Sequence, residues 1–253
     1  MNKIILDNDI NYELDNNIKY DFKDELIKKL NIKVLKDTTL EIYFNSQEIK
    51  LDIQIEVEEN VKLQLVEIKK NMKSKIQNKY ILNSNSNIEI IKINDVSTIN
   101  EKNIINLNGE NANVNLILKT VCKDIEKYDF LINHNAKKTI SNVTTNGLNI
   151  DGNLYFTITT YIPSGNKDCI CNQQNRIINL TEKECVIKPN LLIEEVDVVA
   201  SHSALIGSFK NDEIFYMQRL GIDKSTASKL LIEGFLKNKI SDKLAINFEK
   251  YWR

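Results

Sequence analysis

The feature that most restricts the fold is a long central region in which short strand-like segments follow one another without a helix. From Thr39 onward apolar and polar residues alternate, most regularly over residues 49–57, and this period of two is typical of strands. Further β-branched runs lie at 88–93, 114–118, 129–132, 154–158 and 196–199. No convincing amphipathic helix interrupts residues 75–205, whereas a parallel βαβ sheet needs helices at its crossovers. A sandwich, a barrel and a β-solenoid are the alternatives left.

The turns between these segments favour the solenoid. The 253 residues include only two prolines and seven glycines, which is few for a sandwich with many tight turns. Asparagine is abundant instead, and it can adopt the left-handed backbone conformation that glycine would otherwise supply. Asparagine-punctuated strands at uneven spacing are consistent with stacked repeats. We therefore expect a mainly β protein built as a solenoid, although periodicity alone leaves the sandwich and the barrel open.

Helical patterns are confined to the two ends of the chain. A short helix is predicted at 21–30, where four apolar residues share one face: Phe22, Leu26, Ile27 and Leu30. After residue 208 the apolar spacing again becomes helical, and helices are predicted at 212–220, 223–237 and 241–252. Gly221 is the expected stop of the first of these three, and Asp223 the expected N-cap of the second. The predicted organisation is an N-terminal segment (1–35), a β core (36–208) and a C-terminal helical domain (209–253).

Composition and charge argue against two classes of partner. The chain has 34 Lys and Arg against 35 Asp and Glu, whereas a nucleic-acid binder normally shows a basic excess. No stretch reaches the roughly 18–20 apolar residues of a membrane span. The N-terminus has acidic residues where a signal peptide needs its apolar region. We expect a cytoplasmic protein that binds neither nucleic acid nor a membrane.

The sharpest cluster of reactive residues is Cys169-Ile-Cys171. In an extended strand residues i and i+2 share a face, so both sulfurs would point the same way and could hold a thiophilic metal. Two incidental small residues near a strand edge explain the pair equally well. Cys122 lies in an apolar run and is expected in the core. His202 is either a partly buried histidine bonded to backbone or an exposed imidazole for metal or proton chemistry. No motif of a hydrolase, a nucleotide-binding loop or a zinc finger is present.

A collinear series of motifs occupies residues 187–236, IKPNLLIEEVDVVASHSALIGSFKNDEIFYMQRLGIDKSTASKLLIEGFL. It contains a Lys-Pro-x-Leu strand, a V-x-x-S-H-x-A-x-x-G turn, an acidic-aromatic helix, R-x-G-I and a last helix with G-F. This series resembles the C-terminal signature of the SufB/SufD family of iron–sulfur cluster assembly proteins. Residues 134–162 and 173–180 are also similar to segments of that family.

The resemblance implies a right-handed parallel β-helix with a C-terminal helical domain and no catalytic turnover of its own. Members of this family pair through their β-helices, recruit the ABC-type ATPase SufC through the C-terminal helices, and serve as a scaffold for iron and sulfur, with a cysteine desulfurase as the sulfur source. By position, five residues would form the motif that docks SufC: Phe215, Tyr216, Arg219, Gly221 and Ile222. The alternative for these five is core packing of a helical cap, above all for Phe215.

The resemblance also bears on metal binding. His202 matches a histidine of SufD-type chains that is thought to meet iron at the pair interface. A cysteine of SufB-type chains aligns near Gln174 and is missing here, and Ser203 stands where SufB has a glutamate. Both departures favour a short SufD-like member that pairs with itself or with a SufB-like chain. The candidate ligands for iron or a transient iron–sulfur cluster are His202, Cys171, Cys169 and Cys185.

Two other functions stay open. The same fold could be a purely structural partner that ligates no cluster, because the SufB-type cysteine is missing. A β-helix enzyme acting on polysaccharide is the alternative from another class, although such enzymes usually carry clustered carboxylates or basic groups in a groove and often a secretion signal.

Overall fold

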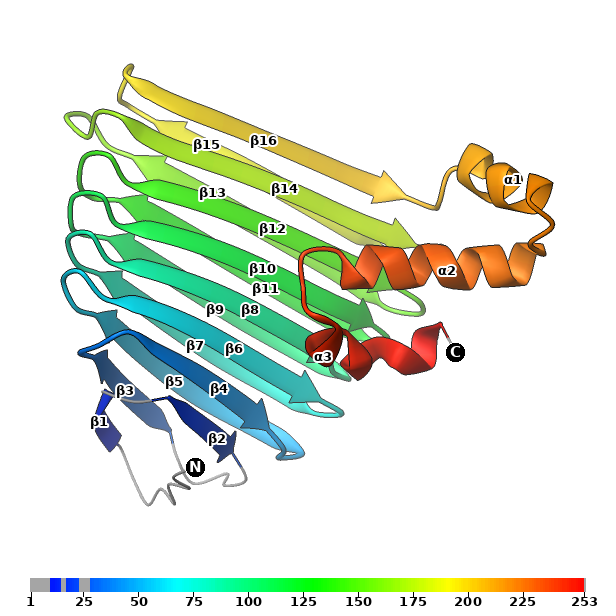
Figure 1. The fold of residues 1–253 in the computed structure, drawn as a ribbon, viewed down its shortest axis with the longest axis horizontal. Helices are drawn as coiled ribbons and strands as arrows, with labels where there is room; N and C mark the ends of the chain where they lie inside the picture. The colour runs from blue at the N-terminus through cyan, green and yellow to red at the C-terminus, as the bar shows by residue number, and fades with distance from the viewer. Residues whose placement is uncertain (1–9, 15–16, 23–27, 253) are drawn as a thin grey trace.

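The computed structural model describes residues 10–14, 17–22 and 28–252, which form two parallel β-sheets and a group of C-terminal helices (Figure 1). Successive strands alternate between the sheets, so the odd-numbered strands form sheet A and the even-numbered strands form sheet B. The strands are β1 (Ile10–Leu14), β2 (Ile18–Phe22), β3 (Lys29–Val34), β4 (Thr38–Phe44), β5 (Glu48–Val57), β6 (Lys62–Lys70), β7 (Lys73–Leu82), β8 (Asn87–Asp95), β9 (Thr98–Leu107), β10 (Asn113–Cys122), β11 (Ile125–His134), β12 (Ile140–Asn149), β13 (Asn153–Ile162), β14 (Cys169–Asn179), β15 (Cys185–Ile193) and β16 (Val198–Gly207). The chain therefore coils as a parallel β-solenoid of about seven turns, which confirms the predicted β-helix.

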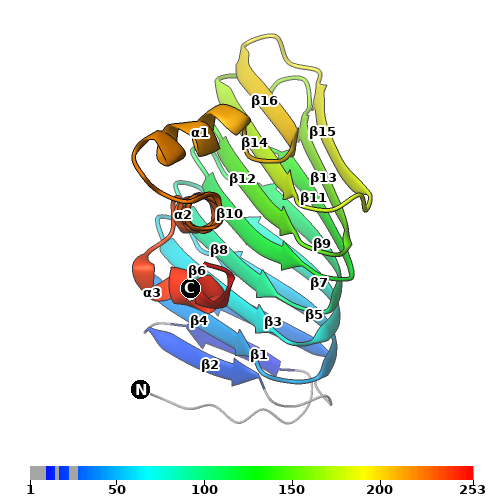
Figure 2. The ribbon, with the colours of Figure 1, turned by 90° about the vertical axis from the view of Figure 1, so that its right-hand side faces the viewer.

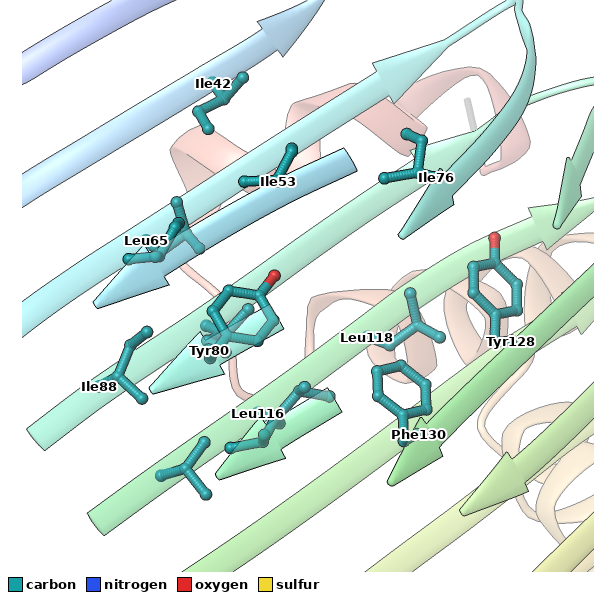
Figure 3. Close-up of a cluster of buried hydrophobic side chains, with 14 of the residues drawn as sticks. Ile42, Ile53, Leu65, Ile76, Tyr80, Ile88, Leu116, Leu118, Tyr128 and Phe130 are labelled. Carbon is teal, nitrogen blue, oxygen red and sulfur yellow. The ribbon is translucent and has the colours of Figure 1, made fainter. Parts of the chain in front are cut away.

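The interior of the solenoid is built from every second residue of each strand. Along β5, for example, the inward residues are buried and the residues between them face outward, as the alternating sequence predicts. The inward side chains of both sheets form one apolar cluster along the stack, and Figure 3 shows part of it around Leu65, Ile88 and Leu116. Burial of each such side chain contributes roughly 1.5–3 kcal/mol to stability. Because the cluster runs through many turns, these turns stabilise one another.

Asparagine forms one corner of the solenoid. Asn60, Asn85 and Asn111 occupy equivalent turns with φ of 62°, 54° and 60°, the left-handed conformation that asparagine tolerates better than most residues. Their side chains also stack, because Asn85 Nδ2 donates to Asn60 Oδ1 at 3.0 Å and Asn111 Nδ2 donates to Asn85 Oδ1 at 2.9 Å. The expected use of asparagine in place of glycine is therefore confirmed at this corner.

The helix predicted at 21–30 is wrong at both of its ends. Its first residues belong to β2 and its last residues to β3, while residues 23–27 lie outside the described part of the chain. The competing pattern is the alternation of Leu30, Ile32 and Val34, which are all buried in the solenoid. Parallel pairing of β3 with β5, for example Leu30 beside Ile53, joins this segment to the sheet, whereas a short helix without tertiary packing is only marginally stable.

The C-terminal helices are α1 (Asn211–Arg219), α2 (Lys224–Lys237), α3 (Asp242–Ala245) and the 3-10 helix η1 (Ile246–Tyr251). The first two predicted helices are confirmed. Gly221 has a φ of 83° after α1, and the Asp223 side chain accepts hydrogen bonds from the backbone N–H groups of Ser225 and Thr226. The third prediction, a single helix at 241–252, is split between α3 and η1, although Leu244 and Phe248 are buried as its spacing indicated.

The C-terminal helices pack on the outer face of sheet B (Figure 2). Phe235, Leu236 and Phe248 join a second apolar cluster with outward residues of the sheet such as Val121 and Leu148. An ion-pair site fastens η1 to the same face.

At that site the buried Asp95 carboxylate lies 2.5 Å from Lys250 Nζ and 2.5 Å from Lys123 Nζ, and it accepts a hydrogen bond of 2.7 Å from Tyr251 OH. Burial alone would raise the pKa of Asp95, but these three hydrogen bonds lower it. The carboxylate is therefore held ionised beneath the last helix.

Candidate partner surfaces and thiol site

The last turn of the solenoid is open. β15 pairs only with β13, and β16 only with β14, within the described residues. An uncovered strand edge presents backbone N–H and C=O groups that a further strand can bind. Large apolar side chains are exposed at this end, including Leu192, Val196, Val199 and Leu205. Exposed apolar groups beside an open edge are typical of a surface that another chain covers.

His202 lies on the inward row of this open turn. In the parallel register it sits beside Gln173 of β14, which is buried in the interior and whose Nε2 donates to Thr160 Oγ1 at 2.9 Å. His202 is nevertheless exposed, because β16 is the last strand of its sheet and no further turn lies above it. Of the two interpretations from sequence, the structure agrees with the exposed position of the imidazole, and its role in metal or proton chemistry stays a prediction.

Cys169 and Cys171 share the inward row of β14. Both are buried together with Ile162, so the expected common direction of the two side chains is confirmed, and this direction is toward the interior beneath β16. Cys169 Sγ lies 3.1 Å from Thr139 Oγ1 and donates to the carbonyl of Ala136 at 3.4 Å. Burial raises the pKa of Cys171 to about 11. Because the thiolate is the metal ligand, this conformation keeps Cys171 in its weakly ligating form.

Cys185 lies apart from these two cysteines. It begins β15, where it packs against the main apolar cluster, and its sulfur accepts a hydrogen bond of 3.2 Å from Asn149 Nδ2. Burial raises its pKa as well. Cys122 is fully buried, which confirms its expected place in the core. Within residues 10–14, 17–22 and 28–252, no three His, Cys, Asp or Glu side chains gather closely enough to hold a metal ion.

Sequence reasoning missed a buried hydrogen-bond chain that ends at Cys169. His134 lies between two hydroxyl groups, with Nδ1 at 2.7 Å from Thr139 Oγ1 and Nε2 at 2.8 Å from Ser141 Oγ. Burial lowers the pKa of His134 to about 4, so this imidazole is neutral at physiological pH. Thr139 connects it to the thiol. His134, Ala136, Thr139 and Ser141 stand at the spacing H-x-A-x-x-T-x-S, which is the part of segment 134–162 that resembles the SufB/SufD family. That motif is the sequence signal that could have found the hydrogen-bond chain.

The docking motif predicted on the C-terminal helices forms an exposed aromatic surface. Phe215 and Tyr216 on α1 are 62% and 66% exposed, so the core interpretation of Phe215 is wrong. None of the α1 residues is buried, because the helix extends away from the solenoid beyond α2 (Figure 1). Arg219 is exposed and Ile222 is half-buried next to Gly221.

The geometry defines a class: a parallel β-solenoid with an open last turn and a C-terminal helix that exposes two aromatic side chains. No helix in the described residues is long and apolar enough to cross a membrane. Comparison with known proteins assigns the family. Residues 33–235 match the family described as SUF system FeS cluster assembly, SufBD core domain. This chain belongs to the SufBD family, and so to the proteins of iron–sulfur cluster assembly.

Two curated relatives agree with this assignment. The chain is 34% identical over 82 residues to the iron–sulfur cluster assembly protein SufD of Bacillus subtilis, a match that covers 32% of this chain and 19% of that protein. It is 49% identical over 49 residues to the chloroplastic protein ABCI7 of Arabidopsis thaliana, covering 19% of this chain and 10% of that protein. The matched segments are therefore short in relation to both relatives.

Proposed function

We propose that this protein is a non-catalytic scaffold subunit in iron–sulfur cluster assembly that pairs through its open last turn and binds an ABC-type ATPase of the SufC kind through α1. The observation that carries the proposal is His202, an imidazole on an inward row that no turn covers. A second solenoid that adds strands to the edges of β15 and β16 would enclose it. The partner is a second copy or a SufB-like chain, with a cysteine desulfurase as the sulfur source and the cytoplasm as the location.

Pairing would create a metal site that the described residues of one chain do not form by themselves. The His202 imidazole is a suitable iron ligand, and ligands from a partner would complete its coordination. Cys171 lies two residues along the neighbouring strand from the position that faces His202. Its thiol contributes only if β16 shifts, because the thiol is buried and protonated in the present arrangement.

The exposed helix α1 supports the second contact. Phe215 and Tyr216 present two aromatic rings to solvent, and Arg219 lies on the same short helix. Aromatic residues and arginine are the residue types most often found at interaction hot spots. We assign this surface to the ATPase.

A silent structural partner is the second candidate, and the burial of Cys169 and Cys171 is the observation in its favour. Polysaccharide hydrolysis has less support. Glu67 and Glu101, a close pair of carboxylates, are sealed in the interior and ion-paired with lysines, whereas hydrolysis needs such a pair in an open groove.

Anaerobic co-expression with a SufC-type ATPase tests the proposal. The ligating scaffold would be supported by a complex that contains iron and sulfide and loses both when His202 is replaced by alanine. Ser203→Ala, on the other face of β16, is the control and should leave iron and sulfide in place. A stable complex without iron or sulfide would favour the silent partner. Phe215→Ser combined with Tyr216→Ser should abolish co-purification, while Ile246→Ser, an exposed apolar residue on η1, should not. Absence of any complex with the unaltered chain would refute the docking proposal.

A further inference from the structure

A pocket of about 800 Å³ lies between α2 and the outer face of sheet B, where β12, β14 and β16 form its floor. We call it the α2 pocket. Its size falls within the range of small-molecule sites, about 300–1,000 Å³. It borders β16 and α1 through Leu205 and Glu213, but it contains neither His202 nor the exposed aromatic residues of α1, and the proposed function does not use it.

The floor of the α2 pocket contains a row of polar side chains from neighbouring turns. Asn146 of β12 and Arg176 of β14 line the pocket. Lys119 of β10 is in direct register with them, so it shares the outer face of sheet B, but it is buried behind the pocket lining. Adjacent strands are about 4.8 Å apart, which places two cationic residues about 10 Å apart with an amide between them. Lys239 adds a third cation from the adjacent row, since its Nζ donates to Thr144 Oγ1 and Gln174 Oε1.

None of these three cations has a carboxylate partner within the part of the chain that the structure describes. Lys119 is fully buried, and its Nζ donates instead to the backbone carbonyl of Phe235 at 3.1 Å. Burial and the nearby charge of Lys239 lower the pKa of Lys119 to about 7. Arg176 Nε is a buried donor without any acceptor. A buried donor that lacks an acceptor destabilises the fold, and an anionic oxygen in the pocket would remove this penalty.

The opposite wall of the pocket is apolar. Leu230, Leu231 and Phe235 of α2 line it, and the Arg176 guanidinium lies 5.5 Å from the centre of the Phe235 ring. Glu213 is the one acidic residue among the lining residues of the pocket, and its carboxylate accepts a hydrogen bond from the backbone N–H of Lys210. The pocket thus combines a cationic floor with an apolar wall.

We propose that the α2 pocket binds a small organic molecule that carries a phosphate group, with the phosphate on Arg176 and Lys239 and the apolar part against α2. The guanidinium suits this role because it donates in a fixed fork that matches phosphate oxygens. Asn146 is 6% exposed, and its Oδ1 has no hydrogen-bond donor among the described residues. This oxygen can accept a hydrogen bond from a hydroxyl or amino group of the same ligand.

Isothermal titration of the full chain with AMP, adenosine and inorganic phosphate tests this proposal. We expect AMP to bind, adenosine to bind at least tenfold more weakly, and phosphate to compete with AMP at higher concentration. Arg176→Gln and Lys239→Gln should each weaken AMP binding by about tenfold or more, because each removes a hydrogen bond to a charged group. Lys79→Gln, which removes an exposed positive charge from the other sheet, is the matched control and should bind AMP normally.

Two results would overturn the proposal: no binding of AMP or phosphate to the unaltered chain, or equal AMP affinity in Arg176→Gln, Lys239→Gln and Lys79→Gln. A thermal melt of each variant shows whether it is folded. If Arg176→Gln is unfolded, Lys239→Gln decides the question, because the Lys239 side chain is bonded only to neutral groups at the pocket edge.

Discussion

Replacing Lys92 by methionine tests whether four charged groups inside the solenoid act as one neutral unit. Glu67, Lys69, Lys92 and Glu101 are all fully buried. Lys92 Nζ lies 2.8 Å from Glu67 Oε2 and 2.7 Å from Glu101 Oε1, while Lys69 Nζ lies 2.6 Å from Glu67 Oε2 and 3.2 Å from Glu101 Oε2. Burial would raise the pKa of Glu67, but the two lysines lower it to about 2. Both carboxylates are therefore ionised at neutral pH and balanced by two ammonium groups.

Lys92→Met removes two of these contacts and leaves two carboxylates with one lysine. Breaking a buried ion pair by deleting one partner typically costs about 3–5 kcal/mol, because a charge stays buried without compensation. For a chain of this length 1 kcal/mol corresponds to about 2–4 °C in melting temperature. The expected loss is therefore roughly 6–20 °C. Methionine has a similar length to lysine, so lost packing contributes little.

Urea unfolding at pH 7, followed by circular dichroism, measures the free energy of unfolding of this variant. The control is Lys92→Met combined with Glu101→Gln, which restores neutrality and leaves Lys69 paired with Glu67. The double variant should recover at least half of the stability lost in the single variant. Two results would refute the idea of a neutral unit. One is a loss below about 1 kcal/mol for Lys92→Met. The other is a double variant whose loss in free energy of unfolding equals the sum of the losses of Lys92→Met and Glu101→Gln measured separately.

Three further changes test other parts of the fold. Asp95→Asn should weaken the docking of η1 by about 1–3 kcal/mol, seen as faster amide hydrogen exchange over residues 242–252 with unchanged exchange in β10. Burial raises the pKa of Glu126 to about 8, so the folded state holds a proton that the unfolded state releases near pH 4.5. The free energy of unfolding should therefore fall by about 1.4 kcal/mol per pH unit between these two values. Glu126→Gln should flatten that slope when unfolding is measured as a function of pH. Asn85→Ala should lower the free energy of unfolding by about 1–2 kcal/mol, because alanine is strained at a φ of 54° and cannot make the side-chain hydrogen bonds to Asn60 and Asn111. Asn85→Gly should lower it less, because glycine adopts this φ without strain. Equal losses in chemical denaturation would contradict the role of the left-handed turn.

The sequence predicts the solenoid best where the interior is apolar. The regular alternation at 49–57 corresponds to β5, whose inward residues are aliphatic. Strands such as β7, β9 and β14 were missed because their inward rows include polar residues, for example Asn78, Glu101 and Gln173, all buried. The partners of these residues lie on other strands, as Glu101 does for Asn78 and Thr160 for Gln173, so no local window of sequence distinguishes them from a solvated loop.

The same limit applies to the candidate sites. Spacing places Cys169 and Cys171 on one face, yet whether that face is buried depends on β16, about 30 residues later in the chain. Lys119 resembles any outward lysine of a strand, and it becomes buried only because α2 packs over it, with its partner Phe235 lying 116 residues away. Exposure and charge balance at these positions are products of long-range packing, which a single sequence does not encode locally.

His202 shows how pattern and position in the stack combine. Val198, Ala200, His202, Ala204 and Ile206 form the row of β16 that continues the buried rows of the turns below. In an earlier turn the next strand of the sheet would stack on this row and bury it. The small and apolar residues of the row are of the kind found in the buried rows. Here the chain leaves the solenoid for α1 immediately afterward, so this inward row is left uncovered at the end of the stack. An interior pattern on an uncovered turn is best explained by a surface that becomes interior on pairing, and this is the physical reason for placing the partner contact there.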